Sequence, residues 1–258
     1  MMTNNYYTIK ILVTNCLIDI RVNDISIHND NVVGSVSAVL PINHVILNSG
    51  VQSYCFVILP LQGSDHFLSD SNFSASIWLY DCNGDVISPR IELQTKEINL
   101  SENTQLPIVN FNGCFEAQVN YTINRWSNCI ELDSIQSLRE AVVLKYREIE
   151  KILQTQNDDT FIKIFQQRDS EIAKAFYMDP SNVSIRSKEI MSFIYEGYKV
   201  RPITGAELMP LWADKRVVTL LKSDFSPALT LANEETGELI EIEMLLGIMN
   251  GQSNFIVV

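Results

Sequence analysis

The chain has 258 residues, of which 46% are hydrophobic and 19% are charged, and its formal net charge is −12. This balance is typical of a folded protein and excludes a largely disordered chain. At this length two domains of ordinary size can each bury a core. The acidity is shared between both halves and no run of Lys or Arg occurs, which disfavours nucleic-acid phosphates and anionic membranes as partners.

The N-terminal sequence MMTNNYYTIK lacks the basic and apolar regions of a secretory signal. No apolar run approaches the roughly 20 residues that a membrane helix needs. If the sequence is complete, we therefore expect a cytoplasmic protein. Five cysteines all precede residue 130 and form no C-x-x-C pair, so we expect reduced, mostly buried thiols.

Residues 1–128 show the period of two that is typical of β-strands. The clearest stretch is 115–124, where apolar residues from Phe115 to Ile123 alternate with polar ones. Two more strands are expected at 7–13 and 18–22. About eight short strands with frequent turns predict an antiparallel β-sandwich over residues 1–128.

Residues 129–258 begin with a helical period instead. Apolar residues recur every three or four positions in three segments, beginning after Asp133, after Asn157 and near Ser184. Asp133 is expected to cap the first helix, and Asn157-Asp158-Asp159 is expected to cap the second, whose stripe includes Arg168. A period of two then returns, with strands predicted at 216–222, 228–232, 239–246 and 255–258. The second and third of these are expected to form a hairpin across 233–237. Helices followed by an antiparallel sheet predict an α+β domain over residues 129–258.

In element order and size, residues 133–258 resemble SnoaL-like, nuclear-transport-factor-like domains. The resemblance implies a cone, in which three helices pack into the concave side of a curved sheet. Such domains include enzymes, ligand binders and bacterial immunity proteins, so the fold alone does not choose a function. The whole chain resembles bacterial two-domain proteins of the polymorphic-toxin immunity type.

Catalytic chemistry finds little support in the sequence. All three histidines lie in the first half, without partners at metal-ligand spacing, and read best as exposed loop residues. SnoaL-like enzymes commonly use a His–Asp pair, and this cone has no His to supply. An Asp or Glu in the cone could still act as a general base, so this alternative is kept. The acidic stretch from Glu234 to Glu243 is interpreted as the solvent-exposed face of a strand, with Ile240 and Ile242 facing the core. We expect no catalytic residue, metal or cofactor.

The remaining candidates for a binding site lie between the third predicted helix and the sheet. In a cone fold this junction is close to the open end. Tyr and Trp are natural anchors for a partner, although packing into the core is the competing interpretation. The candidate partner- or ligand-binding residues are Tyr195, Tyr198, Arg201, Met209 and Trp212.

The function that fits these expectations best is non-enzymatic binding of a protein. We expect an immunity protein that occludes a cognate toxin, because an acidic inhibitor associates rapidly with a basic nuclease-type toxin. One alternative is a small-ligand or carbohydrate-binding protein that uses the cone or the sandwich. The other is an enzyme with an Asp or Glu base in the cone. No nucleic-acid or membrane partner is expected.

Overall fold

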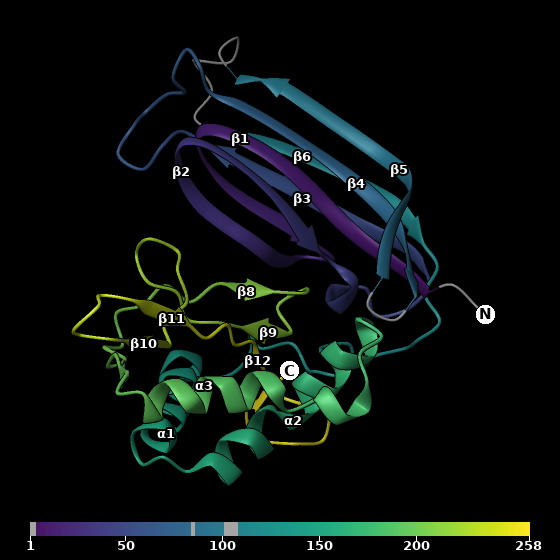
Figure 1. The fold of residues 1–258 in the computed structure, drawn as a ribbon. Coiled ribbons are helices and arrows are strands. Elements are labelled where there is room, and N and C mark those ends of the chain that lie inside the picture. Colours follow the sequence, from purple (N-terminus) through teal and green to yellow (C-terminus); the bar gives the residue numbers. More distant parts are fainter. Residues whose placement is uncertain (1–3, 84–85, 101–107) are drawn as a thin grey trace. The chain divides into compact units, whose positions relative to one another are not determined.

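The computed structural model describes residues 4–83, 86–100 and 108–258 (Figure 1). Contacts divide the chain into two compact units, namely unit 1 (Met1–Ile123 with Ala175–Tyr177) and unit 2 (Asn124–Lys174 with Met178–Val258). Unit 1 is built from β-strands, and unit 2 has three α-helices followed by short strands. The predicted order, all-β and then α+β, is confirmed. The predicted border between residues 128 and 129 lies within unit 2.

Within the described residues, the strands of unit 1 form one hydrogen-bonded antiparallel sheet, ordered β5-β4-β1-β3-β6 with β2 paired to β1. The strands are long, which differs from the eight short ones that were expected. They are β1 (Asn4–Val22), β2 (Ile25–Pro41), β3 (Gly50–Leu59), β4 (Asn72–Asn83), β5 (Val86–Asn99) and β6 (Val109–Ala117).

The two strands predicted at 7–13 and 18–22 are one strand, β1. Between them lies Asn15, a residue type common in turns, whose φ in the structure is 48°. In the structure Asn15 forms a β-bulge instead, and its Oδ1 accepts a hydrogen bond of 2.7 Å from the backbone N–H of Gly34 on β2. A bulge bends a strand without ending its ladder.

The bend at Asn15 lets β1 change partners along one edge. Residues 4–14 pair with β4, and residues 17–22 pair with β3. The sheet therefore curls, and side chains of non-adjacent strands meet inside it. The rings of Phe56 on β3 and Phe73 on β4 lie 5.6 Å apart, and the hydroxyl of Tyr54 donates to Gln94 on β5 at 2.7 Å.

The alternating segment 115–124 is only partly a strand. Burial alternates as predicted from Phe115 to Ile123, but β6 ends at Ala117. Beyond Ala117 the backbone is held by single contacts in place of a ladder. The backbone N–H of Val119 donates to Ser49 Oγ at 2.9 Å, and that of Ile123 donates to the carbonyl of Leu47 at 2.9 Å. Periodic burial therefore persists without strand pairing.

Three residues from much later in the chain complete unit 1. The short 3₁₀ helix η1 (Asn43–Val45) presents the buried side chain of Asn43, whose Nδ2 donates to the carbonyl of Ala175 at 3.1 Å. The ring of Phe176 lies 5.8 Å from that of Tyr6, and the hydroxyl of Tyr177 donates to the carbonyl of Asn5 at 2.9 Å. Ala175–Tyr177 thus closes one end of the sheet.

Unit 2 contains the three predicted helices. Their buried residues follow the predicted stripes, as Val142, Tyr146, Ile149 and Leu153 show on the first of them. The helices are α1 (Leu138–Gln154), α2 (Asp158–Ala175) and α3 (Ile185–Tyr195). As expected, Asn157 caps α2, since its Oδ1 accepts from the backbone N–H of Thr160 at 3.2 Å.

The prediction that Asp133 caps the first helix is wrong. Helix α1 begins at Leu138, and Ser137 before it has a φ of 56° and no side-chain capping bond. The carboxylate of Asp133 instead accepts from Lys215 Nζ at 2.8 Å. That ion pair joins two segments of unit 2, and the helix starts about a turn later than the pattern predicts.

The strands of unit 2 are short and, in the described part of the chain, form two small sheets where a single curved sheet was expected. The sheet orders are β11-β10-β7 and β13-β12-β9-β8. The predicted hairpin across 233–237 is present, with Thr230 opposite Glu241. The strands are β7 (Lys199–Val200), β8 (Leu211–Trp212), β9 (Val217–Val218), β10 (Thr230–Ala232), β11 (Leu239–Glu241), β12 (Leu246–Gly247) and β13 (Ile256–Val257).

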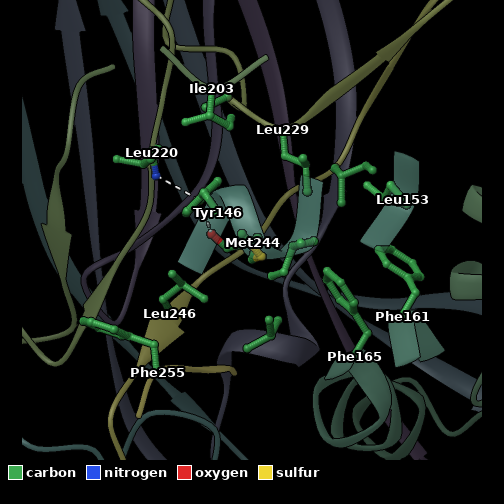
Figure 2. Packing of buried hydrophobic residues seen from close by; sticks show 14 of the residues in the cluster. Tyr146, Leu153, Phe161, Phe165, Ile203, Leu220, Leu229, Met244, Leu246 and Phe255 are labelled. Carbon is green, nitrogen blue, oxygen red and sulfur yellow. Dashed lines mark hydrogen bonds between the residues drawn. The ribbon is translucent and has the colours of Figure 1, made fainter. Parts of the chain in front are cut away.

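One polar side chain, Tyr146, lies at the centre of the apolar core of unit 2 (Figure 2). Its hydroxyl accepts from the backbone N–H of Leu220 at 2.9 Å and donates to the carbonyl of Met244 at 3.1 Å. Thr219 Oγ1 lies 3.1 Å away. Burial raises the pKa of Tyr146 to about 12, so the hydroxyl keeps its proton at neutral pH.

We predict that Tyr146→Phe destabilises unit 2 by about 1–3 kcal/mol, because two buried backbone groups lose their partner. Chemical denaturation followed by circular dichroism measures the change. Tyr195→Phe is the matched control, since Tyr195 is 58% exposed and its loss should change stability by less than about 0.5 kcal/mol. Equal stability of both variants would contradict the role assigned to Tyr146.

Candidate functional site

The structure places the first three predicted site residues around the three-stranded sheet of unit 2. Tyr195 ends α3 and is largely exposed, and its hydroxyl donates to Asp158 at 2.7 Å. Tyr198 is 7% exposed and its hydroxyl donates to Glu238 at 2.5 Å. Arg201 has an exposed side chain and a backbone N–H that donates to Thr230 of β10 at 2.9 Å.

The other two predicted residues lie elsewhere in unit 2. Trp212 is buried in β8, which pairs with β9 in the four-stranded sheet, and Met209 is half-buried against the apolar core. Tyr198 and Arg201 therefore share the β7–β10 neighbourhood, while Trp212 belongs to the other sheet. The packing interpretation fits Met209, Trp212 and most of Tyr198.

The β10–β11 hairpin carries a dense set of exposed carboxylates beside Tyr198. The predicted alternation is confirmed, because Ile242 is 1% exposed while the acidic side chains face solvent. The turn is shaped by Asn233, whose Oδ1 accepts from the N–H groups of Glu235 and Thr236. We call the exposed carboxylates of this hairpin the acidic hairpin surface; they belong to Glu234, Glu235, Glu238 and Glu241.

Two neighbours connect the acidic hairpin surface to β7 and to the end of α3. Lys199 Nζ lies 3.1 Å from a carboxylate oxygen of Glu234, and both side chains are at least two-thirds exposed. The hydrogen bond to Glu238 raises the pKa of Tyr198, so its hydroxyl remains a neutral donor. Leu239, 50% exposed, adds an apolar contact among the carboxylates. A hydrophobic contact ringed by charge is suited to a protein partner.

The interior of unit 2, between its helices and sheets, is filled with apolar side chains (Figure 2). Phe161 and Phe165 of α2 lie with ring centroids 4.6 Å apart, and both are fully buried. The polar hydroxyl of Tyr146 is fully used by its backbone partners. The sequence analysis allowed a ligand site or a carboxylate base in this interior. The structure has packed apolar side chains there.

Sequence reasoning missed a buried ionic cluster in unit 2. Arg168, which the helical stripe counted as one of its members, is 4% exposed, and its Nη2 lies 2.6 Å from Asp169 Oδ1. Ser187 of α3 donates to the other oxygen of Asp169 at 2.5 Å, and Arg168 Nη1 donates to the carbonyl of Glu243 at 3.0 Å. The cluster joins α2, α3 and the β11–β12 connection, which is a structural role.

A surface pocket of about 700 Å³ also lies in unit 2, and none of the predicted site residues lines it. Two of its lining residues bring sulfur atoms together, since Cys129 Sγ and Met249 Sδ lie 3.8 Å apart. Arg216 Nη1 donates a hydrogen bond to the carbonyl of Cys129 at 2.5 Å. Glu131 supplies the opposite charge. The lining residues are Ser127, Asn128, Cys129, Ile130, Glu131, Ser134, Arg216, Met249 and Asn250.

The histidines differ from the exposed loop residues that were expected. His66 is exposed, but His28 lies half-buried within β2 opposite Ile20, and His44 lies in η1 with its ring 5.4 Å from that of Phe176. Strand pairing and ring packing account for these two. Among the described residues, no three His, Cys, Asp or Glu side chains are grouped so that they could hold a metal ion.

The described helices include none that is both long and apolar enough to cross a membrane. Comparison with known proteins finds no matching family model, no matching curated protein and no matching solved structure.

The cysteines are free, and their environments predict very different reactivities. Cys114 is exposed, whereas burial raises the pKa of Cys16 to about 12 and that of Cys129 to about 11. We predict that iodoacetamide at pH 8 alkylates Cys114 at least about 100-fold faster than Cys16 or Cys129, because the thiolate is the nucleophile. Peptide mass spectrometry over time measures the rates. Early alkylation of Cys129 would contradict the prediction and show that reagents reach its thiol through the surface of unit 2.

Proposed function

We propose that the chain is a non-enzymatic binding protein whose acidic hairpin surface docks a basic protein partner. The observation that carries the proposal is the set of four exposed carboxylates on one hairpin, with Leu239 exposed among them. Opposite potentials steer two proteins together and raise their association rate. Tyr195, exposed at the end of α3, is available as an aromatic contact beside this surface.

The partner that fits best is a nuclease-type toxin, which makes this chain an immunity protein. Such a toxin is basic because it binds nucleic-acid phosphates, and an acidic inhibitor covers that same surface. With this function we propose two fold types. Unit 2 is cone-like, of the SnoaL-like kind that immunity families use, and unit 1 is sandwich-like. A bacterial, cytoplasmic inhibitor would meet its toxin before export.

The filled interior of unit 2 supports protein binding over the alternatives of an internal ligand or an internal carboxylate base. Substrates need a concave site that buries most of their surface, and apolar side chains occupy that volume here. A second candidate function uses the surface pocket instead. Arg216 and Glu131 on its wall suit a small zwitterion such as a free amino acid, with Cys129 and Met249 beneath it.

Growth protection tests the function. Toxin domains encoded beside this gene are expressed with and without the chain, and the purified pair is measured by surface plasmon resonance. We expect survival only with the chain and a nanomolar Kd. A neighbourhood without a toxin, together with no protection, removes the immunity proposal. Thermal stabilisation by amino acids alone, without any protein partner, would favour the pocket.

We predict that Glu235→Lys/Glu241→Lys slows association with the basic partner at least about tenfold, because the steering charge is reversed. The dissociation rate should change less. As the control, Glu97→Lys/Glu116→Lys, at exposed positions of β5 and β6, changes the net charge by the same amount and should change association by less than about twofold. Protection that persists with an unchanged association rate would keep the function and move the interface away from the hairpin.

A further inference from the structure

Strand β2 leaves one of its edges unpaired within unit 1. It pairs with β1 along its length, and in the described part of the chain no strand pairs with its other edge. Figure 1 shows β2 as the outermost strand on that side of the sheet. An open edge presents a row of backbone N–H and C=O groups that can template another strand.

The first part of β2 makes a local contact away from β1, because Asn31 Oδ1 accepts from the backbone N–H of Gln62 at 2.9 Å. After Gly34 the strand runs without interruption to Pro41. We call Ser35–Leu40, with the sequence SVSAVL, the neutral edge of β2.

The neutral edge lacks the devices that protect the other side of the same sheet. Strand β5, which ends the sheet, contains Pro89 and the charged residues Arg90, Glu92, Lys96 and Glu97. Proline and charge on an edge strand prevent unwanted pairing. The neutral edge carries no charge and no proline, and its Val39 side chain is 55% exposed. The edge of β5 is therefore guarded, whereas the neutral edge of β2 is left able to pair. Strand β6, which ends the sheet on its other side, also has an open edge among the described residues and carries the charge of Glu116.

We propose that the neutral edges of two copies of this chain pair antiparallel about a two-fold axis, so that the sheet of unit 1 continues through a homodimer. An antiparallel pairing of one stretch with itself is self-complementary, as a two-fold interface requires. Each copy carries a net charge of −12, so two copies repel except where both surfaces are neutral. A basic partner finds no carboxylate on Ser35–Leu40 to attract it.

The pairing is short, which sets its strength. Six residues span roughly 20 Å of strand, and edge pairing alone buries less area than a standard interface. The dimer is therefore weak and concentration-dependent. It uses a surface in unit 1 that differs from the acidic hairpin surface of unit 2, so the two kinds of binding can be tested separately.

Sedimentation equilibrium of the full chain from about 1 µM to about 200 µM tests the proposal. We expect the mass to rise from one copy to two. Ser37→Lys/Val39→Lys places like charges across the two-fold axis and should weaken the dimer at least about tenfold. The matched control is Val51→Lys/Ser53→Lys, which makes the same pair of changes at exposed positions of β3.

Hydrogen exchange of the wild-type chain gives a reading that needs no variant to fold. Backbone amides of Ser35–Leu40 should exchange more slowly at about 200 µM than at about 1 µM, while those of β5 stay unchanged. Three results overturn the proposal. These are a single copy at every concentration, a dimer weakened equally by the control variant, and concentration-dependent protection that lies outside Ser35–Leu40.

Discussion

The buried carboxamide of Asn43 is the contact on which the closure of unit 1 depends. Its Oδ1 accepts from the backbone N–H of Tyr7 at 2.6 Å, and its Nδ2 donates to the carbonyls of Asn5 and Ala175. The backbone carbonyl of Asn43 also accepts from the hydroxyl of Tyr121 at 2.8 Å. A buried carboxamide is tolerated only when its polar atoms find partners. Here those partners come from separate parts of the chain, so the side chain fixes where they meet.

Unit 2 also has a buried polar side chain, Tyr146, whose hydroxyl finds hydrogen-bond partners in the backbone. This arrangement bears on where binding can occur. The hydroxyl anchors two backbone segments inside a largely apolar interior, and the ionic cluster around Arg168 and Asp169 ties the helices together. Polar groups in these positions are fully engaged with the fold. The charged groups that remain available to a partner are on the surface, where the β10–β11 hairpin concentrates its carboxylates.

The periods of the sequence predicted most of the architecture, because a helix or strand with one buried face must repeat its apolar residues. The exceptions are positions where a tertiary contact overrides a local signal. Asn15 looks like a turn but is a bulge, since Gly34 on the neighbouring strand supplies its partner. Asp133 looks like a cap, but Lys215 takes its carboxylate. Tyr198 was predicted as a site residue from its type and its place after the third helix, whereas its link to Glu238 depends on which strand lies beside β7.

The late segment Ala175–Tyr177 also has a consequence for how the protein is made. A ribosome releases the chain from its N-terminus, so all the strands of unit 1 emerge before Ala175 does. Until then Asn43 lacks one acceptor and the carbonyl of Asn5 lacks the Tyr177 hydroxyl. The nascent sheet must wait through the synthesis of α1 and α2 before its last contacts form. A chaperone that holds open strands would find its substrate in that interval.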